Sequence, residues 1–318
     1  MDKINKILKY VTSSDNTFGI LLFKDAVFGV DGIQNKQIVY KRRQKHLLVP
    51  GSIVIQADPF LFVWNKMIYL FYESLPSGGK GYISMVKSRD LTHWSEPMTV
   101  LHEPFHLSFP YVFEHDGDVF MIPETQEVDE IRLYKANRQL TDFQYVRTLL
   151  RQNRSHGLMI NYSDSHLLHK DGLYYLFTSV QRNWNYELEL YYTDDLFNGT
   201  FMRHPKSPVC IDNKYGRCGG SIITTPSGEL LRVTQDCSSF YGRNVSLMRI
   251  LSITAEDYQE KLFQDDIFPI GRQFLFPDGA HQLNITVFQG QYVYATDFKE
   301  RRWNWYMRYL SIKNRLFK

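Results

Sequence analysis

Apolar and polar residues alternate along this chain in a pattern that recurs five times. Each repeat has an apolar run, a two-residue turn and a second aromatic-rich run that ends in a polar residue. In every repeat the turn begins 7 residues after the first position, and the polar end falls 15 residues after it. The repeats are DPFLFVWNKMIYLFYE (58–73), FPYVFEHDGDVFMIPE (109–124), DSHLLHKDGLYYLFTS (164–179), GSIITTPSGELLRVTQ (220–235) and QLNITVFQGQYVYATD (282–297). The pattern predicts five β-hairpins.

The turn residues support this prediction. The turn pairs are Asn65-Lys66, Asp116-Gly117, Asp171-Gly172, Ser227-Gly228 and Gln289-Gly290. Four of the five pairs have glycine second, where a tight hairpin needs a positive φ. The flanking runs are rich in Phe, Tyr, Val and Ile, which favour a pleated, half-buried surface.

The spacing of the hairpins predicts the architecture. Successive repeats begin 51 to 62 residues apart, which leaves room for further strands in each unit. These are expected in KGYISMVKS and EPMTVLHE, EIRLYKA, ELELYYTD, NVSLMRILSI and WNWYMRYLSI. Four antiparallel strands repeated around an axis are typical of a β-propeller. We therefore predict an all-β chain, with residues 1–318 forming a single five-bladed propeller domain.

The fifth unit reaches the end of the chain shortly after its third expected strand. A strand from the first 50 residues, TFGILLF or KQIVYK, is expected to supply the fourth and to close the ring. Closure removes the exposed strand edges that an open ring would leave. The alternative architecture is an irregular sandwich of two packed sheets.

Composition narrows the function classes. The net charge of +3 is nearly balanced, which argues against a nucleic-acid partner, and no apolar run reaches the ~18 residues of a membrane span. Three cysteines without a CxxC pair do not predict a metal site. With no secretory signal in the sequence, we expect a cytoplasmic protein. Aromatic residues make up 15% of the chain, and most of them are expected to fill the core between blades.

In a propeller, the start of each first strand and the end of each second strand meet at one mouth of the central channel. Asp58, Asp164 and Glu124 are the candidate catalytic residues at this mouth. The candidate substrate-binding residues are His106, Ser108, Tyr111, His166, Arg217, Gln235, Asp236, Tyr241, Arg243 and His281. Phe105, Tyr111, Trp184 and Tyr241 are the aromatic residues expected near enough to stack on a sugar.

Crowded carboxylates raise one another's pKa, so that one acid stays protonated while another stays ionised. Such a pair suits chemistry at an anomeric carbon. For Asp58 and Asp164 a functional role is favoured, whereas Glu73 and Asp297 are interpreted as caps of strand ends. Arg217 and Arg243 add positive charge, and an arginine fork can bind a phosphate or carboxylate.

Seven stretches of the chain resemble one family of propeller domains. They are ADPFLF with FYES, PFHLSFPYVFEHDGDVFMIPET, DSHLLHKDGLYYLF, and RCGGSII followed by TQD and YGRNVSL. They are similar to the N-terminal domain of plant glucosamine inositolphosphorylceramide transferases and of related bacterial proteins encoded with polysaccharide-synthesis enzymes. The resemblance covers roughly residues 50 to 300. More distantly, the chain resembles the five-bladed glycoside hydrolases of family 43.

The hydrolase resemblance implies three carboxylates. Asp58 matches the base, and Asp164 matches the residue that tunes the pKa. The acid expected in the fourth unit is missing, because Arg217-Cys218-Gly219-Gly220 stands there and leaves Glu124 as the substitute. His281 lies where related propellers place a histidine near a central ion or water. No cofactor is predicted with certainty, and an ion near His281 is left open.

Three functions are compatible with these features. The first is glycosyl transfer in the synthesis of a surface polysaccharide or glycolipid, with a sugar or glycoconjugate as substrate. The second is a glycoside hydrolase that uses Asp58 as base or nucleophile and Glu124 as acid. The third is a non-catalytic carbohydrate-binding module that acts with a separate transferase. An enzyme is favoured.

Overall fold

The computed structural model describes residues 15–42, 52–151 and 161–302, which form β-strands joined by loops and two short 3₁₀ helices. The 3₁₀ helices are η1 (Ile33–Asn35) and η2 (Gln126–Val128). In these ranges no helix has the length and apolar character needed to cross a membrane. The predicted all-β class is confirmed.

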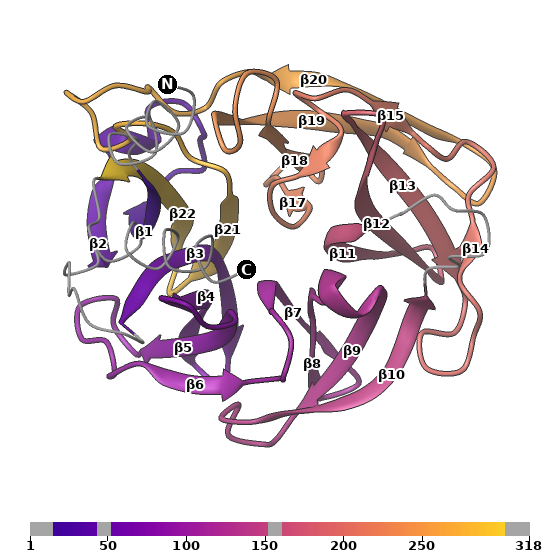
Figure 1. Ribbon diagram of the computed structural model, residues 1–318, viewed down its shortest axis with the longest axis horizontal. Helices are drawn as coiled ribbons and strands as arrows, with labels where there is room; N and C mark the ends of the chain where they lie inside the picture. The colour runs from indigo at the N-terminus through magenta and orange to yellow at the C-terminus, as the bar shows by residue number, and fades with distance from the viewer. Residues whose placement is uncertain (1–14, 43–51, 152–160, 303–318) are drawn as a thin grey trace, which may run out of the picture.

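The strands form four sheets that follow one another around a central axis in chain order (Figure 1). The largest sheet has the order β21-β22-β1-β3-β4-β5-β6, and β2 also pairs with β1. Its strands are β1 (Asp15–Asp25), β2 (Gln37–Arg42), β3 (Ile53–Trp64), β4 (Met67–Pro76), β5 (Tyr82–Ser88), β6 (Met98–Leu101), β21 (Leu283–Phe288) and β22 (Gln291–Arg302).

The other three sheets come from the middle of the chain. The second has the order β10-β9-β8-β7, from β7 (Ser108–His115), β8 (Asp118–Glu124), β9 (Glu130–Ala136) and β10 (Phe143–Arg151). The third has the order β11-β12-β13-β14 with β15 on β13, from β11 (Tyr162–Lys170), β12 (Leu173–Arg182), β13 (Asn185–Thr193), β14 (Met202–Arg203) and β15 (Cys210–Ile211). The fourth has the order β16-β18-β19-β20 with β17 on β18, from β16 (Arg217–Cys218), β17 (Ile223–Thr224), β18 (Leu230–Asp236), β19 (Asn244–Ile253) and β20 (Tyr258–Gln264).

The eight-stranded sheet consists of two groups of four strands. The strands β1 and β3 join the groups through one parallel pair, Phe18 with Ile55. The N-terminal strand β1, which contains TFGILLF, pairs with β22 along its whole length from Asp15 to Asp25. The strand β1 lies beside β22 on the side away from β21, next to which WNWYMRYLSI was expected as the third strand and an N-terminal strand as the fourth. Residues 303–312 themselves lie outside the described residues.

Four of the five predicted hairpins have the expected two-residue turn. Both central residues have positive φ in each, as a type I′ turn requires. The values are 48° and 61° at Asn65-Lys66, 50° and 81° at Asp116-Gly117, 51° and 77° at Asp171-Gly172, and 50° and 74° at Gln289-Gly290. The expected third strands also form, as β5, β9, β13 and β19.

The fourth hairpin differs from the prediction. The amide of Thr225 donates to the carbonyl of Glu229 at 2.9 Å, so three residues rather than two form its loop. Pro226 explains the difference, because it would have to donate its amide hydrogen to Glu229 to close a two-residue Ser227-Gly228 turn, and proline has none. The amide of Gly228 donates to the carbonyl of Thr225, and Gly228 has φ 81°.

Three second strands continue past the polar residue at which they were predicted to end. The strand β4 runs to Pro76, β12 to Arg182 and β22 to Arg302. Glu73 and Asp297 therefore lie inside strands and are buried. This correction matters for the site, because the extended hairpins enclose the carboxylates from the side.

The core lies between neighbouring sheets, where large rings fill the space. Among the largest fully buried side chains are Tyr72, Tyr134, Tyr175, Phe71 and Phe177. The expectation that most aromatic residues fill the core is therefore confirmed for the described residues. Phe105, which was predicted to lie near a sugar, is 6% exposed and packs in the core between the first two units.

Candidate functional site

In three repeats the backbone is distorted at the first position. Asp58, Phe109 and Asp164 have φ of 53°, 44° and 52°, and the strand pairing shifts register beside each of them. Left-handed backbone is costly for a bulky residue such as phenylalanine. It turns the amide hydrogen out of the strand ladder, so each amide needs another acceptor.

A carboxylate from the neighbouring unit accepts each of these amide hydrogens. Asp58 N donates to Asp297 Oδ2 at 3.3 Å, Phe109 N to Asp58 Oδ2 at 3.1 Å, and Asp164 N to Glu124 Oε2 at 3.2 Å. The same spacing in the repeats thus aligns carboxylates from successive units around the mouth. It also fixes their orientation, because each is held by the backbone of the next unit.

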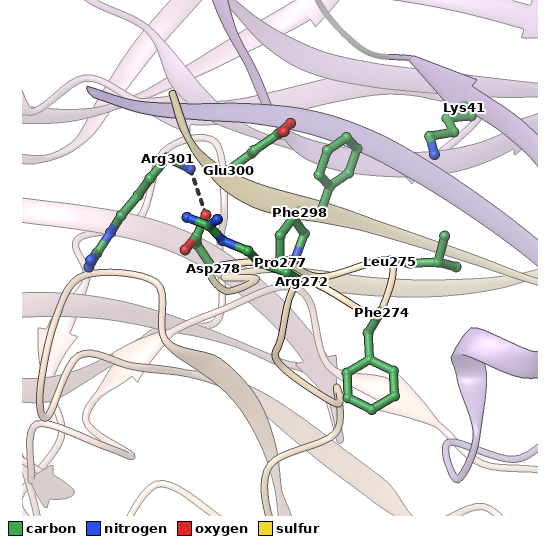
Figure 2. Close-up of a pocket in the computed structure, with 9 residues that line it drawn as sticks. All are labelled: Lys41, Arg272, Phe274, Leu275, Pro277, Asp278, Phe298, Glu300 and Arg301. Carbon is green, nitrogen blue, oxygen red and sulfur yellow. Dashed lines mark hydrogen bonds between the residues drawn. The ribbon is translucent and has the colours of Figure 1, made fainter. Parts of the chain in front are cut away.

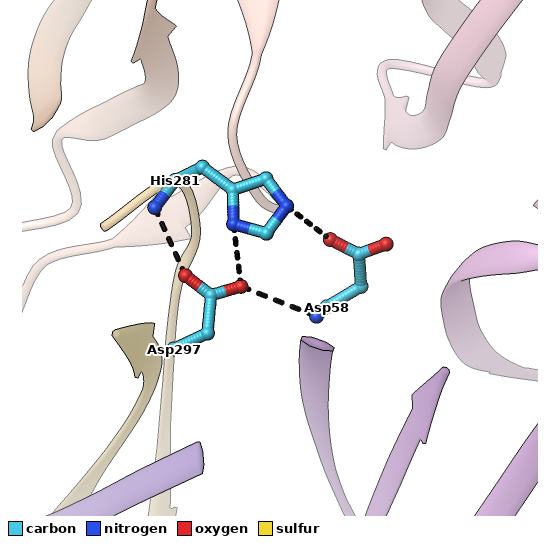
Figure 3. A group of neighbouring side chains, drawn as sticks. All are labelled: Asp58, His281 and Asp297. Atoms are coloured by element: carbon cyan, nitrogen blue, oxygen red, sulfur yellow. Dashed lines mark hydrogen bonds and ion pairs between the residues drawn. The ribbon is translucent and has the colours of Figure 1, made fainter. Parts of the chain in front are cut away.

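His281 connects two of these carboxylates (Figure 3). Its Nε2 lies 3.1 Å from Asp58 Oδ1, and its Nδ1 lies 2.6 Å from Asp297 Oδ2. The backbone amide of His281 also donates to Asp297 Oδ1 at 2.9 Å. Asp297 therefore accepts backbone hydrogens, as a strand cap does, and also pairs with a side chain.

The electrostatics of this group follow from its geometry. Burial alone would lower the pKa of His281, but the carboxylates of Asp297 and Asp58 raise that pKa well above its ordinary value. Burial alone would raise the pKa of Asp58, but hydrogen bonds from His281 and from the Phe109 amide hold that pKa below its ordinary value. A protonated imidazole thus lies between Asp297 and the ionised carboxylate of Asp58.

The same three residues could supply ligands to a cation. One ligand atom from each of Asp58, His281 and Asp297 lies within 4.8 Å of the others. An imidazole binds a metal as the neutral ring, however, and both ring nitrogens of His281 face a carboxylate. A cation would have to replace the proton on His281. The donor set can therefore hold either a proton on His281 or a metal cation in place of that proton. No step of the reaction proposed below depends on a metal.

A second charged group contains Glu124, Asp164 and Arg217. Arg217 Nε donates to Asp164 Oδ2 at 2.5 Å, and Arg217 NH1 donates to the hydroxyl of Tyr186 at 3.0 Å. Burial, followed by the negative charge of Asp164, raises the pKa of Glu124 to about 8. Arg217 is thus committed to Asp164 and Tyr186, rather than standing free for a phosphate as the sequence suggested.

Tyr241 joins the two groups. Its ring centroid lies 4.9 Å from the Arg217 guanidinium carbon and 5.4 Å from the centroid of the His281 ring. The carbonyl of Tyr241 accepts a hydrogen bond from Lys299 Nζ at 2.5 Å. The next residue, Gly242, has φ 67°, and a Cβ there would lie 3.2 Å from the Cβ of His281. Any other residue at position 242 would strain the loop on this path.

Glu73 and His106 form a third pair at the mouth. His106 Nδ1 accepts the amide hydrogen of Gly81 at 3.1 Å, so its ring hydrogen lies on Nε2, 3.3 Å from Glu73 Oε1. Burial, and then the charges of Asp58 and Glu124, raise the pKa of Glu73 well above its ordinary value. Glu73 was interpreted as a cap, and its position makes it a second buried acid.

The remaining predicted residues are distributed around this centre. Ser108 is buried opposite Glu124, and Gln235 is buried opposite Arg217. Asp236 is buried and accepts from Arg243 Nε at 2.8 Å. Arg243 also donates to Asp266, so its charge is compensated.

Tyr111 and His166 lie deeper in the channel. The hydroxyl of Tyr111 donates to the carbonyl of Leu167 at 2.9 Å, and its side chain lines a cavity of ≈ 290 Å³ between the first strands. His166 was expected to contact a substrate, but it is 0% exposed and stacks on Phe177 with a centroid distance of 5.2 Å. Burial, and then the charge of Arg232, lower the pKa of His166 to about 3. It is a neutral residue of the interior.

Sequence reasoning missed Tyr186, which positions Arg217. Tyr186 lies on the extension of the β12–β13 hairpin, which the repeat pattern does not include. A second cavity, of ≈ 460 Å³, lies away from the mouth between β22, β2 and the loop before β21 (Figure 2). Its lining residues include the cations Lys41, Arg272 and Arg301 and the acids Asp278 and Glu300.

Comparison with known proteins gives one family. The family described as "Glucosamine inositolphosphorylceramide transferase 1, N-terminal" matches residues 43–293. The chain is 32% identical over 211 residues to glucosamine inositolphosphorylceramide transferase 1 of Arabidopsis thaliana, which covers 64% of this chain and 26% of that protein. The protein of the same name from Oryza sativa subsp. japonica is 32% identical over 220 residues, 66% of this chain and 28% of that protein. The chain spans about a quarter of the length of these curated relatives.

Solved structures with a similar fold are glycoside hydrolases. A GH43 protein from Bacillus licheniformis matches 80% of this chain and 55% of its own, with a TM-score of 0.55 and 16% identity. A family 117 glycoside hydrolase from Zobellia galactanivorans matches 77% and 84%, with a TM-score of 0.53 and 11% identity. An α-L-arabinofuranosidase from Podospora anserina matches 86% and 83%, with a TM-score of 0.54 and 11% identity. At these identities the likeness shows the propeller type of fold alone.

Proposed function

This chain belongs to the family of N-terminal domains of glucosamine inositolphosphorylceramide transferase 1, and from that premise we propose that it acts on carbohydrate. The proposed activity is transfer of a glycosyl unit during synthesis of a surface polysaccharide or glycolipid. The relatives carry a transferase name, and the chain matches their N-terminal part.

One observation supports the proposal most strongly. At neutral pH, Asp58 is ionised and Glu124 holds a proton, because their environments move their pKa values in opposite directions. A base and an acid at one mouth are what transfer at an anomeric carbon requires. Glu124 is the less buried of the two residues.

In the proposed reaction, Asp58 takes the proton from an acceptor hydroxyl, whose oxygen forms the new bond to the anomeric carbon. The bond between that carbon and the leaving oxygen breaks, and Glu124 gives its proton to the leaving oxygen. Asp164 keeps the pKa of Glu124 high, while Arg217 and Tyr186 hold Asp164 in place. His281 and the Phe109 amide keep Asp58 ionised.

We also propose that the ring has five blades. In this description the eight-stranded sheet counts as two blades, β3-β4-β5-β6 and β21-β22-β1-β2, whose strands pair with each other, among the described residues, at Phe18 and Ile55 alone. The pairing of β1 with β22 along their length supports ring closure by the N-terminal strand.

A hydrolase is the second candidate, and the similar fold of the glycoside hydrolases favours it. Water would then replace the acceptor hydroxyl, with Asp58 and Glu124 in the same roles. A non-catalytic binding module is the third. It is favoured by the engagement of both Asp58 oxygens, with His281 and with the Phe109 amide, and by the small share of the relatives that the chain matches.

Turnover assays on matched variants separate these functions. The protein is incubated with nucleotide-sugars and oligosaccharides, with and without acceptor, and compared with Asp58→Asn and Glu124→Gln. The control is Asp118→Asn, because Asp118 is exposed and lies at the far end of its hairpin. We expect product to require an acceptor, and both mouth variants to lose at least about a hundredfold in rate while the control does not.

Release of free sugar without an acceptor would instead identify a hydrolase. Sugar binding without turnover by the unmodified protein would support the binding module and contradict both catalytic functions.

A further inference from the structure

The turn between β12 and β13 holds a tryptophan in solvent. Asn183 and Trp184 are its central residues, with φ of 49° and 68°, and Arg182 pairs with Asn185 across it. Trp184 is 89% exposed. Left-handed backbone is costly for a bulky residue, and an exposed indole gains no energy from burial. Packing within the described fold does not account for tryptophan at this tip.

The hairpin below the tip is rigidly braced by the segment that follows β15. Tyr186 N donates to Asn213 Oδ1 at 2.9 Å, and Asp212 N donates to the carbonyl of Tyr186 at 3.0 Å. Gly216 allows this approach, since a Cβ there would lie 2.4 Å from the Tyr186 carbonyl oxygen. A side chain presented on a rigid support loses little freedom when a ligand binds.

The hairpin also borders the mouth. Tyr186 accepts a hydrogen bond from Arg217, which in turn holds Asp164. The Arg217 guanidinium lies between the rings of Tyr186 and Tyr241, 5.1 Å and 4.9 Å from their centroids. Trp184 precedes Tyr186 by two residues, at the tip of the same hairpin whose Tyr186 side chain reaches Arg217.

The charges beside Trp184 indicate what the ring contacts. Arg182 is paired with Glu187 and Glu189, and Arg217 is paired with Asp164. These compensated charges give no preference for an anionic surface or an acidic peptide. A flat indole in balanced surroundings suits the apolar face of a neutral ring.

We propose that Trp184 is an outer subsite that stacks on a sugar ring away from the reacting bond. The ligand is therefore a neutral oligosaccharide or a glycan chain of more than one sugar, not a lone monosaccharide. This inference rests on the proposed function, because it places the reacting bond at the carboxylate mouth.

The test uses a series of neutral sugars of varied composition and increasing length, from monosaccharide to hexasaccharide. Affinities are measured by calorimetry for the full chain, for Trp184→Ala and for Trp184→Phe. Val27→Ala serves as the control, because Val27 is 69% exposed. We expect Trp184→Ala to weaken the affinity for the hexasaccharide about tenfold and to leave the affinity for the monosaccharide unchanged. The phenylalanine variant should keep most of the affinity.

Equal hexasaccharide affinity in Trp184→Ala and the unmodified chain would overturn the inference. If Asp58→Asn and Glu124→Gln still abolished turnover, the proposed function would stand without it. Length-dependent loss in Trp184→Ala together with full turnover in both mouth variants would support the subsite and contradict the catalytic proposal. No sugar binding at all would overturn both. A Trp184 fluorescence shift with phosphatidylserine vesicles alone would assign the ring to a membrane surface.

Discussion

The imidazole of His281 approaches Asp58 through Nε2, which lies 3.1 Å from Oδ1. This contact decides the protonation state of the carboxylate. Asp58 is 6% exposed, and burial alone would favour its neutral form. The positive charge of His281 keeps it ionised instead. A histidine from the last repeat thus prepares the candidate base in the first.

Replacing His281 should shift the pH dependence of turnover. In His281→Gln the amide carries no charge, so the pKa of Asp58 rises. The acidic limb of kcat/KM should move upward by about one pH unit, with a smaller effect on the rate at the plateau. A pH–rate profile measures the shift. An unchanged acidic limb would show that His281 does not control the base.

Glu124→Gln should flatten the dependence of stability on pH. The folded-state pKa of Glu124 is about 8, above its ordinary value of 4.5, so the folded chain keeps a proton that the unfolded chain releases. The stability of the unmodified protein therefore falls as pH rises between these values. Over this pH window, we expect the free energy of unfolding to fall by about 2 kcal/mol less in Glu124→Gln than in the unmodified protein.

Urea unfolding at pH 5 and pH 8 measures this difference. Glu256→Gln is the control, because Glu256 is exposed. If the free energy of unfolding changed equally between pH 5 and pH 8 in Glu124→Gln and in the unmodified chain, the raised pKa of Glu124 would be contradicted.

Removing Arg217 should destabilise the fold through Asp164. Asp164 is 5% exposed, and the Arg217 guanidinium lies 2.5 Å from it. Arg217→Met leaves this buried carboxylate without its partner and should cost about 3 kcal/mol. Adding Asp164→Asn should recover much of the loss, which a double-mutant cycle can measure. Strictly additive losses would show that the two residues do not interact.

Gly242→Ala should displace Tyr241 from the mouth. The backbone at position 242 has φ 67°, where a Cβ costs about 1–2 kcal/mol, and the Cβ would also crowd His281. We expect lower thermal stability and weaker sugar binding. Gly29→Ala is the matched control, because a Cβ at Gly29 meets no atom within 4 Å. Equal thermal stability of the two variants would contradict the proposed role of Gly242.

Much of this fold can be predicted from the sequence, because the residues of hairpin turns are characteristic of the turn type. Asn65-Lys66, Asp116-Gly117, Asp171-Gly172 and Gln289-Gly290 set the register of the repeat. Pro226 is also a local signal, and its missing amide hydrogen predicts the different fourth turn. The N-terminal strand beside β22 is a long-range contact, which only the incomplete last repeat indicated.

The candidate site can be predicted from the sequence only in part, and the reason is physical. The period brings Asp58, Glu124 and Asp164 to one mouth, but it does not say which side chains a neighbour will cover. His166 shares the period and is fully buried against Phe177. Tyr186 lies outside the period and reaches Arg217 because β12 and β13 extend beyond the predicted hairpin.

The central claim is that Glu124 holds a proton at neutral pH while Asp58 does not. A ¹³C NMR titration of the glutamate side-chain carboxyl carbons measures this directly, with Glu124→Gln used to assign the signal. We predict a transition for Glu124 near pH 8. A transition near its ordinary value of 4.5 would contradict the claim, because Glu124 would then be ionised at neutral pH and could not act as the acid.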